Sequence, residues 1–243
     1  MIGRAEEAGM NRISLLRSTI ALWVSFAVLL ALQMTASGDE SQDSVLDESL
    51  KIYAVHVVQF PTDSWLGNGV YLGNGLILTA AHVAGAFWKI LRVQIAGETL
   101  ATHVIKRGQF ETVDLALLSV DDNKLPVSLR LRRMPICKGD PTPGEAVVVA
   151  TPEAIAVSHI IAPRQLPRNI APKYRTAIND VATTGNSGSG VFDEQRQCLL
   201  GIISAKISET QNSRNNPSLR PIKRDVAKYF VPAPLISAFL APQ

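Results

Sequence analysis

The chain has 243 residues, of which 47% are hydrophobic and 19% charged, and its formal net charge is only +3. This ordinary globular composition excludes an intrinsically disordered protein and is sufficient to bury a sizeable core in one large or two small domains. The basic residues are scattered, with no basic stripe and no known binding motif, so the composition also argues against nucleic-acid binding.

The N-terminal segment has the three-part layout of a secretory signal peptide. Arg12 and Arg17 precede the apolar run IALWVSFAVLLAL at 20–32, and small polar residues follow it. The run is short for a membrane span, so we expect cleavage near 36–38 and removal of residues 1–38. The alternative is an uncleaved N-terminal anchor that faces the exterior. The protein is therefore predicted to be secreted or periplasmic, with membrane association only if the segment is uncleaved.

Export also bears on Cys137 and Cys198, the only two cysteines of the chain. An oxidising compartment favours a disulfide between them, and closing so long a loop would stabilise the fold by roughly 4 kcal/mol in the chain-entropy model. Two separate buried thiols are the alternative. Two cysteines so far apart do not have the spacing of a metal site, and we expect neither a metal nor a cofactor.

Beyond an acidic, polar segment at 39–49, which is expected to be a flexible lead-in, short apolar runs dominate the chain. Runs rich in Val, Ile and Leu are punctuated by Gly, Asn or Pro, as is typical of an all-β barrel or sandwich. The segment 123–143 is expected to connect two halves, 208–225 to form a long loop, and PLISAFL to form a short C-terminal helix. The runs are YAVHVVQF, GVYLGNGLILTAA, KILRVQIA, THVIKR and DLALLSV in the first half, and EAVVVATP, AIAVSHIIAP, GSGVF, CLLGIISAKI and AKYFVPA in the second.

Three short stretches carry the residue types of nucleophilic catalysis. His82 lies in LILTAAHV, Asp114 in VDLALLSV, and Ser187 in the glycine-rich GNSGSG. A serine hydroxyl becomes a good nucleophile when an imidazole takes its proton, and a buried carboxylate fixes the tautomer of that imidazole. The backbone N–H groups of Gly185 and Ser187 are expected to form an oxyanion hole, with Gly188 allowing the substrate to approach.

In this order, TAAH, DLALL and GNSGSG resemble the three signatures of the chymotrypsin-fold, or trypsin-like, serine proteases. His82 and Asp114 are 32 residues apart and Asp114 and Ser187 are 73 apart, and these compact gaps are most similar to the bacterial HtrA/Deg-like branch. The resemblance covers about residues 50–240. It implies an all-β fold with two six-stranded antiparallel β-barrels, at about 50–125 and 140–235 of a protease domain spanning 50–243. The active site would lie in the cleft between the barrels.

Carried over residue by residue, the resemblance makes His82 the general base and acid, Asp114 its orienting partner and Ser187 the nucleophile. The implied activity is that of a serine endopeptidase that cleaves polypeptide substrates through an acyl-enzyme intermediate. Asn186 stands where the digestive branch has aspartate, so we expect no zymogen activation of the trypsin type. No PDZ domain is expected after the protease domain, and the oligomeric state is left open.

The resemblance also predicts substrate-binding residues in two segments, which are Val181, Ala182 and Thr184 before the nucleophile and Ser204, Ala205 and Lys206 after it. Val181 and its neighbours would suit an uncharged, small or medium apolar side chain before the scissile bond. Ser204 would lie beside the bound peptide. Lys206 stands where the family often has glycine, and it would narrow the cleft, attract an acidic substrate or point to solvent.

Two other function classes fit parts of the pattern. An α/β-hydrolase has a G-x-S-x-G elbow and the chain order serine, acid, histidine. This chain has the order His82, Asp114, Ser187 and lacks the long helical patterns of that class. The second alternative is a catalytically silent or latent binding module with a protease fold. Such modules often lose a member of the triad, whereas this chain retains all three residues.

Overall fold

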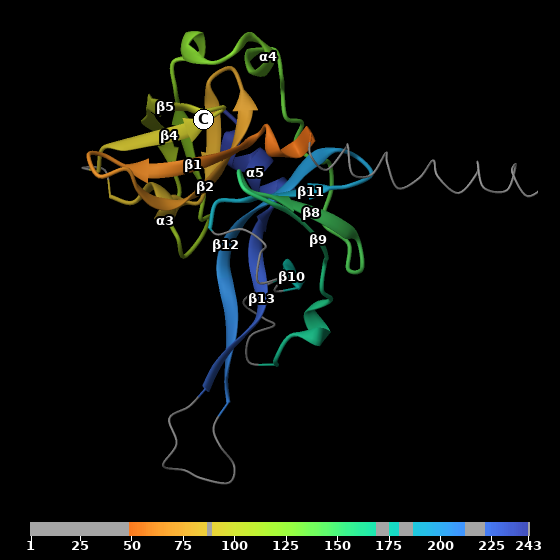
Figure 1. The fold of residues 1–243 in the computed structure, drawn as a ribbon. Helices are drawn as coiled ribbons and strands as arrows, with labels where there is room; N and C mark the ends of the chain where they lie inside the picture. The colour runs from red at the N-terminus through yellow and green to blue at the C-terminus, as the bar shows by residue number, and fades with distance from the viewer. Residues whose placement is uncertain (1–48, 87–88, 169–174, 180–186, 212–221, 243) are drawn as a thin grey trace, which may run out of the picture. The chain divides into compact units, whose positions relative to one another are not determined.

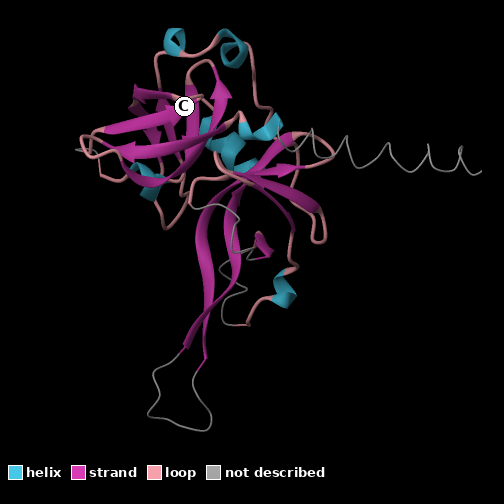
Figure 2. Cartoon of the chain, viewed as in Figure 1, coloured by secondary structure: helices cyan, strands magenta, loops and turns pink. Residues whose placement is uncertain are grey.

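The computed structural model describes residues 49–86, 89–168, 175–179, 187–211 and 222–242, all of which belong to one compact unit, Asp47–Gln243. These residues form two curled antiparallel sheets with few helices (Figure 1, Figure 2), which confirms the predicted all-β class. The predicted signal segment and nearly all of the lead-in lie outside the described residues. Within the described part of the chain, no helix has the length and hydrophobicity needed to cross a membrane.

The first sheet has seven strands in the order β5-β4-β1-β2-β3-β7-β6. Its edge strands β5 and β6 are separated along the chain by Thr102 alone. The Thr102 N–H donates to the Leu91 carbonyl oxygen (3.3 Å), and its hydroxyl donates to the Ser119 carbonyl oxygen (2.8 Å). The predicted six strands become seven because Thr102 divides the strand that joins the two edges. The bounds are Ala54–Gln59 (β1), Ser64–Gly73 (β2), Leu76–Thr79 (β3), Leu91–Ile95 (β4), Glu98–Ala101 (β5), His103–Arg107 (β6) and Ala116–Ser119 (β7).

The second sheet has six strands, as predicted, in the order β10-β13-β12-β11-β8-β9. A bridge between Ile160, just after β9, and Ile178 of β10 brings its two edges together, so this sheet also curls on itself. The bounds are Ala146–Ala150 (β8), Ile155–His159 (β9), Ala177–Asn179 (β10), Gly190–Asp193 (β11), Cys198–Gln211 (β12) and Ile222–Pro232 (β13).

The hairpin of β12 and β13 is longer than the sequence predicts. The expectation of a loop over 208–225 is wrong at both ends, because β12 continues to Gln211 and β13 begins at Ile222. Polar side chains support this pairing: the Ser208 hydroxyl donates to Asp225 Oδ1 (2.7 Å), and Glu209 stands opposite Arg224. Cross-strand pairs of opposite charge stabilise a ladder without apolar residues. Figure 1 shows the two strands extending together away from the rest of the sheet.

An apolar cluster joins the two sheets. It combines Val70 of β2 and Leu78 of β3 with Phe192 of β11 and Val231 of β13, all buried. The predicted C-terminal helix is present as α5 (Ala233–Leu240), and its Ile236 packs into the same cluster. Burial of apolar surface stabilises such contacts by about 25 cal/mol per Å². The cluster therefore fixes the position of the loops that each sheet contributes to the site.

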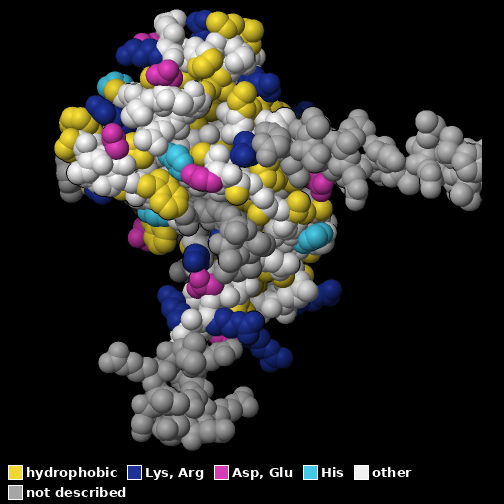
Figure 3. Space-filling view, in the orientation of Figure 1, with side chains coloured by type: hydrophobic (Ala, Val, Ile, Leu, Met, Phe, Trp, Pro, Cys, Tyr) yellow, Lys and Arg dark blue, Asp and Glu magenta, His cyan; other side chains and the backbone are white. Residues whose placement is uncertain are grey.

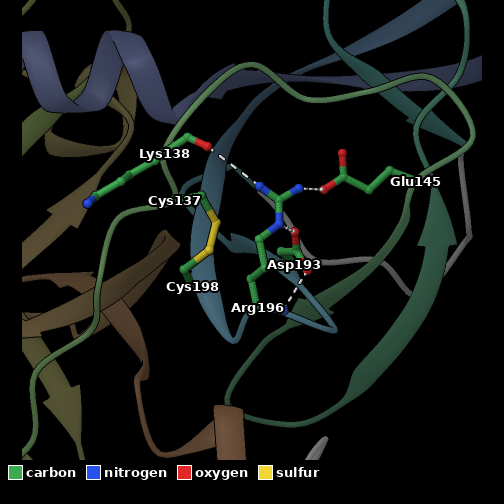
Figure 4. The surroundings of a disulfide bond; sticks show 6 residues. All are labelled: Cys137, Lys138, Glu145, Asp193, Arg196 and Cys198. Carbon is green, nitrogen blue, oxygen red and sulfur yellow. Dashed lines mark hydrogen bonds and ion pairs between the residues drawn. A yellow bond between two sulfur atoms is a disulfide. The ribbon is translucent and has the colours of Figure 1, made fainter.

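Cys137 and Cys198 form a disulfide, with their Cα atoms 5.0 Å apart, which decides between the two alternatives that the sequence leaves open. The bond ties the connection between the sheets to the first residue of β12. Beside it, Arg196 forms ion pairs with Asp193 (2.5 Å) and Glu145 (2.9 Å) (Figure 4). The disulfide and these ion pairs anchor the connection to the second sheet.

Candidate active site

His82 and Asp114 are brought together by two neighbouring strands of the first sheet. His82 lies on α3 (Ala81–Ala84), a single turn that follows β3, and Asp114 lies just before β7. Because β3 and β7 pair directly, the end of one strand meets the start of the other. His82 Nδ1 is 2.7 Å from Asp114 Oδ2, and the His82 backbone N–H donates to Asp114 Oδ1 at 3.0 Å. The imidazole therefore turns Nδ1 toward the carboxylate and keeps Nε2 for another partner.

Asp114 is almost completely buried, with 2% of its surface exposed. Burial alone raises the pKa of its carboxyl group, but hydrogen bonds from His82 and Ser204 outweigh burial, so that the pKa lies below the ordinary value for aspartate. The Ser204 hydroxyl donates to Asp114 Oδ2 at 2.6 Å. The carboxylate is thus ionised at neutral pH and can stabilise a positive charge on the imidazole.

The imidazole of His82 is supported on one side and accessible on the other. The ring of Phe110 meets it edge to face, with the ring centroids 5.5 Å apart. About a third of the His82 side chain is exposed, in contrast to the buried carboxylate that holds it. A bound molecule can therefore reach the ring without displacing Asp114.

Ser187 lies just before β11 and contacts the second sheet. Its hydroxyl donates to the Ser204 carbonyl oxygen at 3.2 Å, and within the described residues no hydrogen bond joins it to His82. Ser204 consequently contacts two of the three predicted catalytic residues, Ser187 through its carbonyl oxygen and Asp114 through its hydroxyl. The resemblance predicted Ser204 to lie beside the substrate, and it did not indicate this contact with the acid.

Gly188 has a different role from the one expected. Its φ is +90°, and a Cβ atom there would lie 1.9 Å from the Asn68 carbonyl oxygen, so the space beside it is filled by β2 and not available to a substrate. The Asn68 N–H donates to the Ser187 carbonyl oxygen at 2.9 Å. Gly188 therefore lets the serine loop pack against the first sheet, which places Ser187 between the two sheets.

Asn68 is a site residue that was not predicted from the sequence. Its side-chain amide donates to Ser189 Oγ at 2.8 Å, and its Oδ1 accepts from Trp65 Nε1 at 3.3 Å. Its backbone carbonyl oxygen accepts from the Thr79 hydroxyl at 2.5 Å. Asn68 thereby fixes the loop that carries Ser187 and Ser189. Its only signal in the sequence is a polar residue between two glycines of an otherwise apolar strand.

A pocket of about 360 Å³ adjoins Ser187. Of the predicted substrate-binding residues, Ala205 and Lys206 line this pocket, and Ser204 precedes them as a buried residue. Lys228 of β13 also lines this pocket and was not predicted from the sequence. Its only signal in the sequence is that it lies two residues before Phe230, so that both side chains are on the same face of a strand. The other predicted residues, namely Val181, Ala182, Thr184 and the oxyanion-hole residue Gly185, lie outside the described residues.

Comparisons with known proteins agree with this architecture. The family model of the trypsin-like peptidase domain matches residues 67–202, which is more than half of the chain. The sequence matches none of the curated proteins with which it was compared. Among solved structures, the active form of the Rv3671c protease from M. tuberculosis superposes with a TM-score of 0.54 at 16% identity, over 82% of this chain and 85% of that one.

Two further protease structures superpose similarly. The HtrA-type protease AlgW gives a TM-score of 0.56 at 19% identity, over 81% of this chain and 61% of that one. The serine endoprotease from Yersinia pestis gives 0.54 at 18% identity, over 81% of this chain and 64% of that one. At these identities the structural likeness establishes the fold, and the family model establishes the family. The chain belongs to the trypsin-like peptidase family and is a serine endopeptidase by class.

Proposed function

We propose that this chain is an extracytoplasmic serine endopeptidase in which His82, Asp114 and Ser187 form the catalytic triad. The observation that carries the proposal is the buried Asp114 carboxylate, which holds His82 through both Nδ1 and the backbone N–H. A general-base histidine needs this contact, because it fixes one tautomer and stabilises the charge that develops on the ring.

In the proposed reaction, Ser187 Oγ attacks the carbonyl carbon of the scissile peptide bond while His82 Nε2 takes the hydroxyl proton. The negative charge moves to the former carbonyl oxygen, where the backbone N–H groups of Gly185 and Ser187 are proposed to stabilise it. His82 then gives the proton to the leaving amine, the C–N bond breaks, and an acyl group remains on Ser187. A water molecule deprotonated by His82 hydrolyses this ester and restores the serine.

One local change has to precede the attack. The Ser187 hydroxyl donates to the Ser204 carbonyl oxygen in the structure, so it must rotate about χ1 to another staggered position and donate to His82. The hydrogen bond that it gives up has a net value of about 0.5–1.5 kcal/mol. This is small beside the 8–23 kcal/mol by which enzymes typically lower a barrier, and the binding of a substrate can supply it.

We further propose that residues 1–38 direct export and are cleaved, which leaves the lead-in at 39–49 and the protease domain at 50–243. The Cys137–Cys198 disulfide supports a secreted or periplasmic location, because such bonds persist in oxidising compartments. An uncleaved segment would instead tether the same domain to the membrane. N-terminal sequencing of the exported protein distinguishes these two outcomes.

A latent or silent binding module is the second candidate function. One observation favours it: the Ser187 hydroxyl bonds to Ser204 and not to His82 in the described part of the chain. In a permanently silent protein this hydrogen bond would keep the serine from being activated. In an active enzyme it would be exchanged for a bond to the imidazole.

Labelling of the purified exported protein with a fluorophosphonate tests the proposal. This reagent reacts with serines that are activated by a neighbouring base, and mass spectrometry of the labelled peptide locates the modified residue. We expect labelling at Ser187 and not at Ser189, with loss of labelling in Ser187→Ala and His82→Ala. A folded wild type that is not labelled would overturn the proposed activity and leave the binding module as the supported function.

A further inference from the structure

We propose that His56 is a positioning residue, which acts on the loop of Ser187 through the side chain of Asn68. The inference rests on the proposed function, because it assumes that the position of Ser187 sets the rate of attack on a peptide bond. A continuous series of side-chain contacts carries it. The series begins at Glu153 in the turn between β8 and β9, crosses two neighbouring strands of the first sheet and ends at Ser189, two residues after the proposed nucleophile.

Asn68 holds the serine loop at three consecutive residues. Its backbone N–H donates to the Ser187 carbonyl oxygen at 2.9 Å, and its side-chain amide donates to Ser189 Oγ at 2.8 Å. Between these two bonds, Gly188 packs directly against the Asn68 carbonyl oxygen. Only 1% of the surface of Asn68 is exposed, so its amide cannot turn toward water. The direction of this amide therefore contributes to the position of the loop.

Two side chains are directed at Oδ1 of Asn68 and set the orientation of its amide. Trp65 Nε1 lies 3.3 Å and His56 Nδ1 lies 3.1 Å from this oxygen. An indole nitrogen can only donate, so the oxygen of the amide is the end that faces Trp65, and the nitrogen is the end that faces Ser189. Because an amide oxygen only accepts, His56 Nδ1 is the donor in the second bond. The rings of Trp65 and His56 also meet edge to face, with their centroids 6.0 Å apart.

The other ring nitrogen of His56 contacts Glu153. His56 Nε2 is 2.5 Å from Glu153 Oε1, and since a carboxylate accepts, Nε2 also donates. The ring then carries a hydrogen on both nitrogens and a positive charge, which Glu153 balances. Asp63 lines the same pocket as His56, but it pairs with Arg92 at 3.7 Å. The imidazole of His56 is thus held at both nitrogens and cannot turn over without breaking both contacts.

The turn that carries Glu153 is connected to the serine loop by the second sheet itself. Ala150, the last residue of β8, pairs with Gly190, the first residue of β11. The backbone N–H and the hydroxyl of Thr151 both donate to the Ala154 carbonyl oxygen, at 2.8 and 3.0 Å, which fixes the shape of the turn. The series of contacts therefore leaves the second sheet at the turn, passes through the first sheet and returns to the second sheet at the serine loop.

The exposure of the ion pair indicates that its main contribution is not to stability. The His56 side chain is 21% exposed and the Glu153 side chain 61%, and on the face drawn in Figure 3 a histidine lies beside an acidic side chain. Ion pairs open to water contribute little to the free energy of unfolding. In contrast, a displacement of about 1 Å can reduce a rate on the order of 100-fold. Changes at His56 should therefore affect the reactivity of Ser187 more than the stability of the fold.

The test measures how fast a fluorophosphonate labels Ser187 in His56→Phe, as a function of the concentration of the reagent. Phenylalanine keeps a ring against Trp65, which lines the pocket that adjoins Ser187, but it cannot donate to Asn68. We expect the maximal rate of labelling to fall about 10-fold, and the concentration that gives half of this rate to change less than about twofold. An unchanged maximal rate in a folded His56→Phe protein would overturn the inference.

His103→Phe is the matched control for this variant. His103 is an exposed histidine on β6, which β3 and β7 separate from β2 within the same sheet, so its replacement should leave the maximal rate of labelling unchanged. The free energy of unfolding of both variants is measured in urea. A loss of stability in His56→Phe, without a loss of labelling rate, would show that His56 has only a structural role.

Two variants of Glu153 test the start of the series. Glu153→Gln keeps an oxygen that can accept from His56 Nε2, and it should lose less than about twofold in the labelling rate. Glu153→Ala removes the acceptor and should lose about fivefold. Equal rates for these two variants would overturn the role of Glu153. If His56→Phe does not fold, this pair of variants still decides, because the side chain of Glu153 is largely exposed.

A double variant tests whether the contacts act as one series. Ser189→Ala removes the hydroxyl at the far end, so His56 can no longer act on the loop through it. The double variant His56→Phe/Ser189→Ala should therefore be labelled about as fast as the slower of the two single variants. Losses that multiply would show two independent effects and would contradict a connection through Asn68.

Amide hydrogen exchange separates this inference from the proposed catalysis, because it requires no reaction at Ser187. In His56→Phe, exchange over residues 187–193 should be at least about fivefold faster than in the wild type, and in His103→Phe it should be unchanged. A labelled wild type, with neither measurement altered in His56→Phe, would refute the positioning role and keep the catalytic proposal. Faster exchange in His56→Phe, with a wild type that is not labelled, would refute the catalysis and keep His56 as a residue that positions the loop.

Discussion

The hydroxyl of Ser204 donates to Asp114 Oδ2 at 2.6 Å, and the carbonyl oxygen of the same residue accepts from the Ser187 hydroxyl at 3.2 Å. A single residue of β12 therefore contacts the proposed acid on the first sheet and the proposed nucleophile beside the second. Asp114 Oδ2 is shared by Ser204 and His82 Nδ1. Ser204 thus helps to set the direction in which the carboxylate faces the imidazole.

Replacement of Ser204 by alanine should impair the orientation of His82 without emptying the substrate pocket. The lost hydrogen bond is to a charged group, and such bonds contribute roughly 1.5–3 kcal/mol. We expect kcat to fall about 10-fold or more with KM changed little, and the fluorophosphonate labelling rate to fall in parallel. The pKa of Asp114 should also rise, because one of the hydrogen bonds that lower it is gone.

Ser208→Ala is the matched control for this variant. Ser208 lies on the same strand and also donates to a carboxylate, but its partner is Asp225 (2.7 Å) and not Asp114. This variant should keep the wild-type labelling rate. Equal rates for Ser204→Ala and the wild type would show that Asp114 is oriented without Ser204.

The lowered pKa of Asp114 predicts a pH dependence of stability. Its ordinary value is 3.8, and the folded-state pKa lies below this value. The unfolded chain then binds the proton more tightly than the folded chain, so the ionised carboxylate stabilises the fold above about pH 4. This stabilisation is lost as the pH falls through the folded-state pKa. Urea unfolding at pH values between 7 and 3 measures the effect.

Asp114→Asn cannot ionise and provides the reference for this measurement. The stability advantage of the wild type over Asp114→Asn should be constant near neutral pH and should shrink below about pH 4. A difference between the two proteins that is independent of pH would contradict the assignment of a lowered pKa to Asp114.

The parts of the fold and site that could be predicted are those with a strong local signal. His82 and Ser187 lie in short motifs next to apolar strands, and the long Val- and Leu-rich runs correspond to strands in both sheets. β5 and β10 were missed because ETLA and AIN are short and lack an apolar pattern. The seventh strand of the first sheet likewise has no hydrophobic pattern of its own, since it arises where Thr102 divides one longer strand into β5 and β6.

The remaining site residues depend on contacts between distant parts of the chain. Asn68 and Ser189 are hydrogen-bonded although they are 121 residues apart, and no local pattern marks either residue as a partner of the other. The position of Lys228 near Ser187 depends on the pairing of β12 with β13, so its neighbours in the sequence do not predict it. The polar ends of this hairpin were assigned to a loop because charged cross-strand pairs leave no alternation of apolar and polar residues.

Removal of the disulfide should lower stability without changing the fold. We expect the double variant Cys137→Ala/Cys198→Ala to lose roughly 2–4 kcal/mol, because the unfolded chain is no longer constrained by a long closed loop. The apolar cluster between the sheets does not include either cysteine, so fluorophosphonate labelling should persist at low temperature. Urea unfolding measures the loss. A reducing agent should destabilise the wild type by a similar amount and leave the double variant unaffected; an equal effect on both would contradict this explanation.

The need for glycine at position 188 can be separated from the general cost of its backbone conformation. Gly188 and Gly139 have nearly the same φ, +90° and +92°, which costs a residue with a side chain about 1–3 kcal/mol. A Cβ at Gly139 has no neighbour within 4 Å, whereas one at Gly188 would lie 1.9 Å from the Asn68 carbonyl oxygen and 2.6 Å from Thr79 Oγ1. Gly139→Ala should therefore lose only the conformational cost and remain reactive toward fluorophosphonate.

Gly188→Ala has to move the serine loop away from β2 as well. We expect a loss of stability clearly larger than that of Gly139→Ala, and loss of labelling at Ser187 even where the variant remains folded, because the Asn68 N–H can no longer hold the Ser187 carbonyl oxygen. Thermal unfolding and labelling of the two variants, measured side by side, check both parts. Equal losses of stability with labelling retained in both would mean that the position of Ser187 does not depend on the contact between Gly188 and Asn68.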